Sequence, residues 1–266
     1  MIRLLLETAT DVCSVAVADG TTLLAERTGG SANLHSSHLT IFIAEALEQA
    51  GLTLGEVGEV VLSDGPGSYT SLRVGAATAK GLCVALPGLA LRTVPTLAAL
   101  ALASGTQAGP VLATLNSRRG EVFGQLFDFG ARTQVQGGAE KGAVPPPPAG
   151  LGKLGPDHLR PEYLSPQNVR LTEDDWFARL RLAAGTASIV VCGPGQERVR
   201  QALTGARWAD DAGAVRYAAP LHCAARHLLA PAAAPAYSKL ADVAAYEPFY
   251  LNAPFVTKSK KKLLGR

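Results

Sequence analysis

The sequence predicts an α/β fold in which two similar lobes face each other across a cleft. Hydrophobic residues make up 47% of the 266 residues and charged residues 18%, so a sizeable core is available. Each half is expected to hold a strand hairpin, a helix, a strand, a Gly-Pro-Gly turn and a helix, with the turns at residues 65–67 and 193–195. This repeat indicates duplicated lobes whose turns both face the cleft. The alternative is coincidence, because Gly-Pro pairs commonly form turns.

In the first half, short apolar or alternating runs between turn residues predict five strands. They are residues 2–8, Val12–Ala18, Thr22–Arg27, Val57–Ser63 and Leu89–Val94. Helices are expected over Leu34–Ala50, where apolar residues recur with helical spacing, over Ser71–Leu86 and from Thr96 to Ser104. These elements form the expected first lobe, residues 1–105.

In the second half, the same patterns predict three strands and two helices. The strands are Val111–Asn116, Glu121–Phe127 and Ile189–Cys192, and the helices are Asp174–Ala183 and Gln196–Leu203. A segment that includes Pro145–Pro148 is too rich in Pro and Gly for regular structure. We expect a second lobe over residues 106–256, whose final helix can cross back to the first lobe, and a basic tail over residues 257–266.

The most informative stretch is residues 65–75, which read Gly-Pro-Gly-Ser-Tyr-Thr-Ser-Leu-Arg-Val-Gly. Gly tolerates positive φ and Pro restricts φ, so Gly-Pro-Gly predicts a sharp turn. Ser68 or Thr70 can then cap the following helix. Free backbone N–H groups at such a strand-to-helix turn suit an anion or a closely packed partner.

The formal net charge of +3 comes from the end of the chain. Five basic residues and no acidic residue lie in the last nine positions: Lys258, Lys260, Lys261, Lys262 and Arg266. The rest of the chain has 20 basic and 22 acidic residues. The body is therefore not expected to bind nucleic acid through its overall charge. For the tail, a solvated terminus is favoured over a contact with RNA or a partner.

Cysteine usage and hydropathy favour the reducing cytoplasm. Cys13, Cys83, Cys192 and Cys223 form no Cys-x-x-Cys pair and lie in apolar segments, as buried free thiols do. Apolar runs fall short of the roughly 18 residues of a membrane span. The N-terminus becomes acidic too early for a secretory signal.

The common nucleotide and hydrolase motifs are absent. The sequence has no Gly-Lys-Ser/Thr phosphate loop, no Gly-x-Gly-x-x-Gly after the first strand and no Gly-x-Ser-x-Gly elbow. Two-lobed nucleotide enzymes of the actin and sugar-kinase type carry Asp in the first hairpin turn of each lobe, where it holds hydrated Mg²⁺. Here Glu7 and Asn116 occupy those places, and an Asn side chain has no charge to offer a hard cation. Phosphoryl transfer is disfavoured, whereas nucleotide binding stays open.

The histidines do not predict a metal site. His35 and His38 are spaced i, i+3 near a helix start without the Glu of a His-Glu-x-x-His motif, so surface histidines are the favoured interpretation. His222 and His227 are expected on a helix, where a spacing of five places them on different faces.

Two helices of the first half have apolar faces beyond those needed for their own core. The helix Ser71–Leu86 is apolar or small all round, which is typical of a helix buried on both sides. The helix before it carries a second face with Leu34, His38, Ile41 and Glu45. We expect these faces to dock onto another chain, since outer helices of a two-lobed fold face solvent. The alternative is that the second lobe covers them.

Five segments in order resemble a known family: Glu7–Thr10, His35–Leu39, Gly65–Gly75, Arg118–Phe123 and Glu247–Leu251. They resemble the TsaB family, also called YeaZ, of bacterial tRNA threonylcarbamoyladenosine biosynthesis proteins. The resemblance covers nearly the whole chain and is strongest over residues 1–125. It implies an actin-like, ribonuclease H-like (ASKHA) fold with duplicated lobes.

The resemblance also implies a non-catalytic cytoplasmic subunit that binds and activates TsaD, which transfers a threonylcarbamoyl group to the adenosine beside the tRNA anticodon. TsaE, an ATPase, joins that complex, the tRNA is reached only indirectly, and homodimers form when TsaD is missing. The implied TsaD interface lies on the two helices: Leu34, His38, Ile41, Glu45, Val74, Ala77, Thr78, Gly81 and Ala85. No cofactor is firmly implied. The resemblance leaves weak nucleotide binding at the interface with TsaD open, and the weak candidates for a cleft site are Thr8, Gly65, Gly67, Ser68 and Arg118.

Departures from the family pattern weaken any claim of nucleotide hydrolysis. Glu7 replaces the more usual Asp, Asn116 takes the acidic place of the second lobe, and Ser71 stands where Gly is common. The stretch Thr93–Leu100 has no histidine, whereas TsaD carries its metal motif there. The peptidase label that the family has carried finds no metal or nucleophile here. The rival hypothesis is an actin-type ATPase or small-molecule kinase that uses the cleft.

Overall fold

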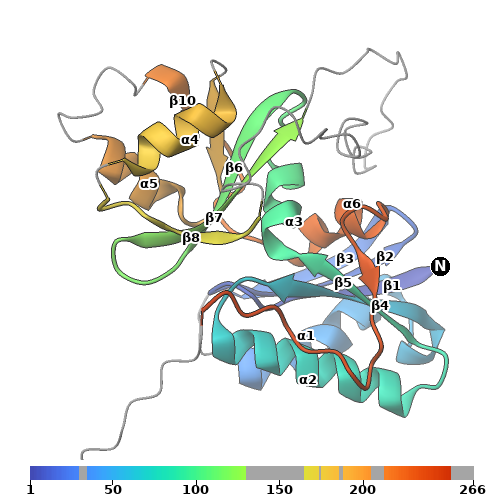
Figure 1. Ribbon diagram of the computed structural model, residues 1–266. Coiled ribbons are helices and arrows are strands. Elements are labelled where there is room, and N and C mark those ends of the chain that lie inside the picture. The colour runs from blue at the N-terminus through green and yellow to red at the C-terminus, as the bar shows by residue number, and fades with distance from the viewer. Residues whose placement is uncertain (30–34, 130–164, 174, 186–187, 205–212, 253–266) are drawn as a thin grey trace, which may run out of the picture.

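Two mixed β-sheets, one from each half of the chain, organise the molecule (Figure 1). The computed structural model describes residues 1–29, 35–129, 165–173, 175–185, 188–204 and 213–252. The first sheet has the order β11-β5-β4-β1-β2-β3 and the second β10-β9-β6-β7-β8. The strands of the first sheet are β1 (Ile2–Glu7), β2 (Cys13–Asp19), β3 (Thr22–Gly29), β4 (Val57–Gly65), β5 (Ala90–Pro95) and β11 (Lys239–Leu240). Those of the second are β6 (Gly109–Asn116), β7 (Glu121–Phe129), β8 (Gln167–Arg170), β9 (Ile189–Cys192) and β10 (Val215–Tyr217).

The two sheets repeat one topology. In each, the first three strands form an antiparallel meander, and the fourth and fifth strands extend it in parallel on the other side of the first strand. Strands β1 to β5 thus correspond to β6 to β10. The prediction of a two-lobed α/β fold with duplicated lobes is confirmed.

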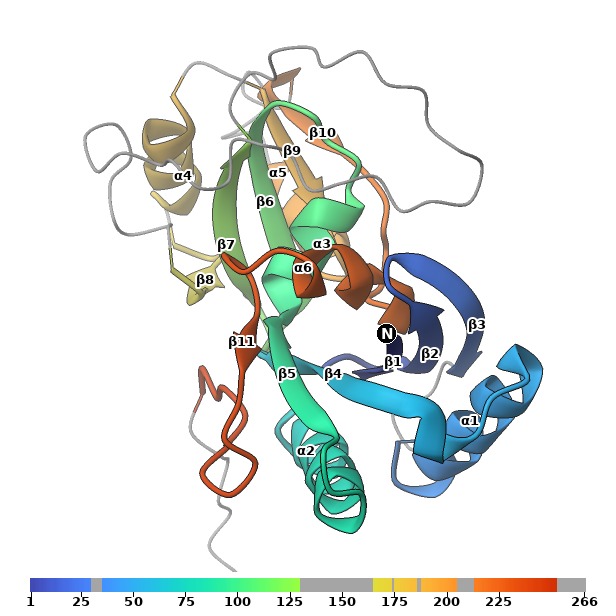
Figure 2. The same ribbon diagram turned by 90° about the vertical axis from the view of Figure 1, so that its right-hand side faces the viewer.

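The helices divide into an outer and an inner set (Figures 1 and 2). Helices α1 (His35–Ala50) and α2 (Tyr69–Ala85) cover the outer face of the first sheet, and α4 (Trp176–Ala184) and α5 (Gln196–Leu203) cover that of the second. Between the lobes lie α3 (Thr96–Ala103), the 3-10 helix η4 (Ala225–Leu228) and α6 (Leu229–Ala232). A further 3-10 turn, η1 (Leu54–Glu56), links α1 to β4.

Three apolar clusters hold these layers together. One packs α1 and α2 onto the first sheet, and another packs α4 and α5 onto the second. The third lies between the lobes, where α3 is apolar almost throughout and its residues 96–101 are buried. The cluster between the lobes fixes the two sheets relative to each other.

The expectation of a helix through His222 and His227 is wrong. His222 lies in a bend, and the short helix η4 begins only at Ala225. Hydrogen bonds hold this bend instead: the Ala224 N–H donates to His227 Nδ1 at 3.0 Å, and the Ala225 N–H donates to Ser14 Oγ at 2.9 Å. This bend carries the chain from the second lobe back onto the first sheet.

After β11, residues 241–252 form a C-terminal strap that crosses the first lobe toward the second (Figure 1, red). Lys80 on α2 donates through Nζ to the carbonyls of Ala244 and Tyr246. The Tyr246 hydroxyl donates to Asp64 Oδ1 at 2.9 Å, and the Phe249 N–H donates to the Asp64 carbonyl at 2.8 Å. The strap therefore rests on α2 and on the end of β4.

Candidate functional site

A pocket of about 460 Å³ opens between the lobes at the ends of β1 and β6. Both Gly-Pro-Gly turns reach it, because Gly67 and Pro194 are among its lining residues. The full lining comprises Ala9, Thr10, Asp11, Val12, Gly67, Ser68, Tyr69, Leu115, Asn116, Ser117, Arg118, Phe123, Pro194, His222, Tyr250 and Asn252.

Close backbone contacts shape the walls of this pocket, and they require glycine. A Cβ on Gly67 would lie 2.2 Å from the Ala9 carbonyl oxygen, where the Ser68 N–H donates at 2.8 Å. In the second lobe, a Cβ on Gly193, which has a φ of +92°, would lie 2.2 Å from the Thr114 carbonyl oxygen. Each turn is thus pressed against the end of its own lobe's first strand.

The five predicted cleft residues separate into two groups. Gly67, Ser68 and Arg118 line the pocket. Thr8 and Gly65 lie behind its wall. A Cβ on Gly65 would meet the Phe249 carbonyl at 2.4 Å, and Thr8 is fully buried with its hydroxyl against Gly75. A role of these residues in nucleotide binding stays a prediction.

Glu7, the residue at the place of the metal-binding Asp, does not reach the pocket. It is fully buried, and its Oε1 accepts the Ala9 N–H at 2.7 Å, while Oε2 has no hydrogen-bond partner. Burial raises the pKa of this carboxyl to about 7, against the lowering effect of its hydrogen bonds. Asn116 does line the pocket, and Asp11 is the one carboxylate among the described lining residues. The part of the chain that the structure describes holds no cluster of three or more metal-binding side chains.

Arg118 and the free N–H groups at the start of α2 are the groups of this pocket suited to an anion. The Ser68 hydroxyl, which is at the N-cap position, makes no capping bond and instead accepts from Ser71 Oγ at 3.0 Å. The side chains around this pocket can therefore bind and orient a polar ligand. Among the described lining residues, the hydroxyls of Ser68 and Ser117 are hydrogen-bonded to Ser71 and to Asn168.

Tyr250 and Asn252 are site residues that sequence reasoning missed. Their strap brings them to the pocket from far along the chain, and the ring of Tyr250 packs 4.6 Å from that of Tyr69. The one signal for them was the family-like segment Glu247–Leu251, which carries no local pattern of a binding site.

A second hollow, of about 490 Å³, lies between α1 and α2 on the outer side of the first lobe. We call it the α1–α2 groove; it is lined by Thr40, Ile43, Ala44, Leu47, Leu54, Ala77, Thr78, Gly81 and Leu82. The inner helices α3 and α6 lie on the opposite face of the sheet, so the second lobe does not cover the groove (Figure 1). Thr40 and Ala44, on α1, were missing from the predicted interface.

The predicted interface residues lie in or beside this groove. Ala77, Thr78 and Gly81 line it, Ala85 is exposed further along α2, and Val74 is half-buried. On α1, Ile41 is 47% exposed. The His38 ring packs against Phe42 at 5.8 Å, and Glu45 pairs with Arg27 of β3 at 3.2 Å. Leu34 lies outside the described residues.

Comparisons with known proteins bear on the predicted resemblance. The family model described as "TsaD: tRNA N6-adenosine threonylcarbamoyltransferase" matches residues 22–139. The tRNA threonylcarbamoyladenosine biosynthesis protein TsaB of Haemophilus influenzae is 35% identical over 129 residues, which cover 45% of this chain and 51% of that protein. TsaB of Escherichia coli is 31% identical over 122 residues, 45% of this chain and 52% of that protein. Over about half of its length, this chain is therefore similar to TsaB proteins.

The fold of this TsaB/YeaZ-like chain has been seen in a crystal structure from Pseudomonas aeruginosa. That structure, of an uncharacterized protein with similarity to peptidase YEAZ, superposes with a TM-score of 0.62 at 22% identity, covering 94% of this chain and 99% of the other. The sequence alignments extend over about half the length of the curated TsaB relatives. Among the described residues, no helix is both long and apolar enough to cross a membrane.

Proposed function

We propose that this chain is a non-catalytic subunit that binds and activates TsaD in the threonylcarbamoyl modification of tRNA adenosine next to the anticodon. The similarity to TsaB proteins supports the process, and the uncovered α1–α2 groove supports a docking role within it. We place the complex, which TsaE joins, in the cytoplasm.

The α1–α2 groove carries this proposal. Its walls are small or apolar side chains, and Val84 and Ile41 beside it are 76% and 47% exposed. Apolar surface of this kind marks an interaction site, because water exposure of such a surface is unfavourable. Small residues such as Ala77 and Gly81 let a partner helix approach closely. A helix of TsaD is the occupant we propose, and a second copy of this chain takes its place when TsaD is missing.

The test is a pair of arginine substitutions on two different helices. Gly81→Arg places a long cation in the groove without internal strain, because a Cβ at Gly81 meets nothing within 4 Å. We expect co-purification with TsaD to be lost while the far-ultraviolet circular dichroism and the unfolding midpoint stay unchanged. The matched control is Ala178→Arg on the exposed side of α4 in the second lobe, which should bind TsaD normally. Retained co-purification of Gly81→Arg would show that another surface binds TsaD.

The rival function, an actin-type ATPase or small-molecule kinase, would use the pocket between the lobes. The observation in favour of this rival function is the pocket between the lobes, which has a volume of about 460 Å³ and is lined in part by Arg118. Against it stand the buried position of Glu7 and the neutral side chain of Asn116. Phosphate release by the purified chain with Mg²⁺ and ATP separates the two: we expect none above a no-protein control, whereas turnover lost in Asn116→Ala or Arg118→Ala would favour the rival.

A further inference from the structure

The lining of the pocket between the lobes holds one carboxylate, Asp11, and one guanidinium, Arg118. Both side chains are exposed, and they come from different lobes. Asp11 lies between β1 and β2, and Arg118 lies between β6 and β7, which is the corresponding place in the second sheet. They do not pair with each other, and in the described part of the chain neither has another ion-pair partner. The pocket thus offers one anionic and one cationic contact, each from its own lobe.

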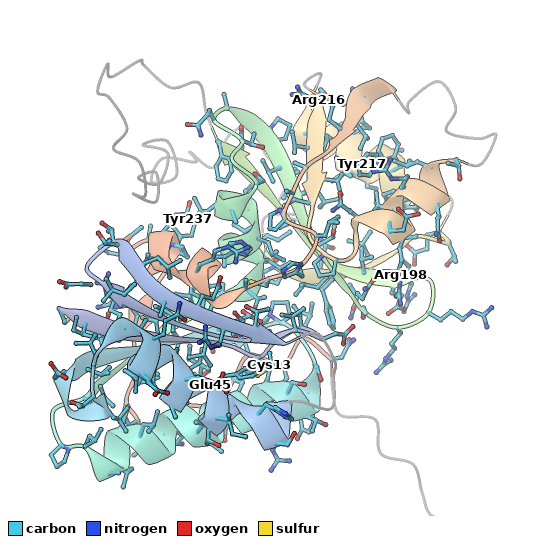
Figure 3. All side chains as sticks on the ribbon, turned by 180° about the vertical axis from the view of Figure 1, so that it is seen from behind. Cys13, Glu45, Arg198, Arg216, Tyr217 and Tyr237 are labelled. Carbon is cyan, nitrogen blue, oxygen red and sulfur yellow. The ribbon has the colours of Figure 1, made fainter. Side chains whose placement is uncertain are left out.

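Hydrogen bonds hold the backbone on both sides of the pocket. Arg198 of α5 donates through Nη1 to three carbonyls of the β6–β7 turn, at 3.1, 2.7 and 2.9 Å: Ser117, Arg118 and Glu121 (Figure 3). In the first lobe, the Ala9 carbonyl accepts the Ser68 N–H at 2.8 Å, and the Val12 N–H donates to Thr10 Oγ1 at 3.3 Å. Fixed turns on both sides reduce the cost of ordering the site when a ligand binds.

Most other polar side chains of the lining already hydrogen-bond within the protein: Thr10, Ser68, Ser117 and Asn252. Asn116 is exposed at the end of β6 and has no hydrogen-bond partner among the described residues. His222 is exposed and, apart from the two tyrosines, is the remaining ionisable side chain of the lining. The groups left for a ligand are therefore few, and Asp11 and Arg118 are the charged ones.

The rest of the lining is largely apolar or aromatic. Leu115 and Phe123 are 2% and 6% exposed and belong to the cluster between the lobes, so the pocket reaches the buried interior. The rings of Tyr69 and Tyr250 pack with centroids 4.6 Å apart at the same pocket. Burial of an apolar group against this surface is favourable.

A ligand that matches this lining carries one positive charge, one negative charge and an apolar group. A nucleoside triphosphate would bring several negative charges to one arginine, with Asp11 repelling them. A dicarboxylate would meet Asp11 and a diamine would meet Arg118 with a charge of the same sign. A zwitterion satisfies both charges at once.

We propose that this pocket binds a free amino acid with a large apolar or aromatic side chain. Its ammonium group lies at Asp11, its carboxylate lies at Arg118, and its side chain packs on Leu115, Phe123 and the ring of Tyr250. The volume of about 460 Å³ is in the range of small-molecule sites. The pocket is separate from the α1–α2 groove, so this proposal goes beyond the TsaD function and does not depend on it.

The experiment is isothermal titration calorimetry of the purified chain with L-phenylalanine and two blocked derivatives that keep its ring. N-acetylphenylalanine lacks the ammonium group, and phenylalaninamide lacks the carboxylate. Each should bind about 5-fold more weakly than phenylalanine, because one charge of the site is then unmatched. L-alanine keeps both charges but buries less apolar surface, so it should also bind more weakly.

Two substitutions assign the contacts. Asp11→Asn should weaken phenylalanine binding about 5-fold and leave N-acetylphenylalanine unchanged, and Arg118→Gln should weaken it equally and leave phenylalaninamide unchanged. The matched controls are Arg119→Gln, on the same turn but outside the lining, and Glu48→Gln on α1; both side chains are exposed, and both variants should bind as the wild type does.

Equal affinity for phenylalanine and both blocked derivatives would overturn the proposal, as would no measurable binding at millimolar concentration. ATP that binds more tightly and displaces phenylalanine would also overturn it and would assign the pocket to a nucleotide. Gly81→Arg should bind phenylalanine as the wild type does while losing TsaD, so failure of this proposal and failure of the TsaD proposal are distinguishable.

Discussion

The two lobes share one sheet topology but differ in what their outer helices present to solvent. On α5 of the second lobe, the buried residues are Gln196, Val199 and Leu203, and the exposed ones are mostly charged or polar: Glu197, Arg200 and Gln201. On α2 of the first lobe, the exposed residues of the second half are small or apolar: Ala77, Gly81, Val84 and Ala85.

This difference shows that the fold itself does not require an apolar outer face. The second lobe completes the same order of five strands with an outer helix that is amphipathic in the ordinary way. In the second lobe, Leu182 of α4 is 57% exposed, but it lies beside Arg179 and Arg181 rather than in a groove. The apolar face of the first lobe is therefore a feature of this lobe alone, and it is the feature on which the proposed TsaD contact rests.

The largest stability effects are expected at one tightly packed glycine in each Gly-Pro-Gly turn, the third residue of the first turn and the first residue of the second. Gly67→Ala should cost about 5 kcal/mol, enough to unfold a domain of ordinary stability, because its Cβ would overlap the Ala9 carbonyl at 2.2 Å. Gly193→Ala should cost a similar amount, because the new Cβ would lie 2.2 Å from the Thr114 carbonyl oxygen and Gly193 has a φ of +92°, which favours glycine. Urea unfolding measures the cost of both substitutions, and a cost at only one of them would show that only one turn depends on its close backbone contact.

The control for these substitutions is Gly81→Ala in the α1–α2 groove. Its Cβ has open space, and Ala favours a helix over Gly by about 1 kcal/mol, so this variant should be slightly more stable than the wild type. Destabilisation by Gly81→Ala would mean that the groove is not open in the isolated chain.

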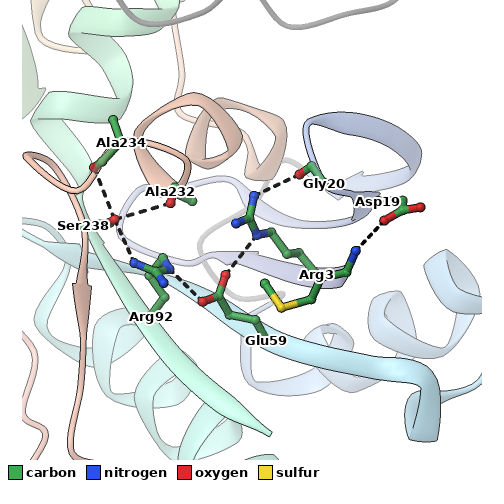
Figure 4. A network of polar contacts seen from close by, with 9 residues as sticks. Arg3, Asp19, Gly20, Glu59, Arg92, Ala232, Ala234 and Ser238 are labelled. Carbon is green, nitrogen blue, oxygen red and sulfur yellow. Dashed lines mark hydrogen bonds and ion pairs between the residues drawn. The ribbon is translucent and has the colours of Figure 1, made fainter.

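The next effect concerns a buried ion pair that the second lobe lacks among its described residues. Glu59 on β4 is 2% exposed and accepts from Arg3 at 2.9 Å and from Arg92 at 2.7 Å (Figure 4). Arg92 also donates to Ser238, which anchors the chain just before β11. The corresponding strand β9 is apolar throughout. Glu59→Gln leaves two partly buried guanidinium groups unpaired and should cost about 4 kcal/mol in urea unfolding.

The contrasting carboxylate of the second lobe is Glu173. It pairs with Arg179 at 2.6 Å and Arg170 at 3.3 Å on the surface, where water screens such pairs. Glu173→Gln should therefore leave the unfolding midpoint where it is. Equal losses from Glu59→Gln and Glu173→Gln would show that burial does not set the difference.

Sequence patterns predicted the parts of both lobes that carry their own signal. Strands β1, β4, β6 and β9 are apolar runs between turns, and α1 has a clear helical stripe. The short edge strands β10 and β11 have no such pattern, because they are defined by pairing with β9 and β5. The burial of Glu7 could not be predicted from the sequence either. It depends on the bend around Cys223, where the chain returns from the second lobe to the first.

The smallest effect, and the one specific to the first lobe, is the titration of Glu7. Glu7 ends β1 and is buried, whereas Asn116 ends β6 and is exposed. Burial raises the pKa of Glu7 from 4.5 to about 7, so the folded state holds its proton over a range in which the unfolded chain has lost it. The contribution of Glu7 to the free energy of unfolding therefore falls as the pH rises from 4.5 to about 7, by about 3 kcal/mol in all.

His227 works in the opposite direction. Burial, with the nearby Arg226 and His222, lowers its pKa from 6.5 to about 4, so its contribution to stability is lost as pH falls through that range. Between pH 4.5 and 6.5, the contributions of Glu7 and His227 to the free energy of unfolding change in opposite directions and largely cancel each other. Glu7→Gln keeps an acceptor for the Ala9 N–H and removes the contribution of Glu7, so between pH 4.5 and 6.5 its free energy of unfolding should rise with pH relative to that of the wild type. Glu45→Gln, an exposed carboxylate paired with Arg27, is the control and should retain the wild-type profile. Parallel curves for Glu7→Gln and wild type would mean that folding does not shift the pKa of Glu7, and the contrast with Asn116 would then lose its physical basis.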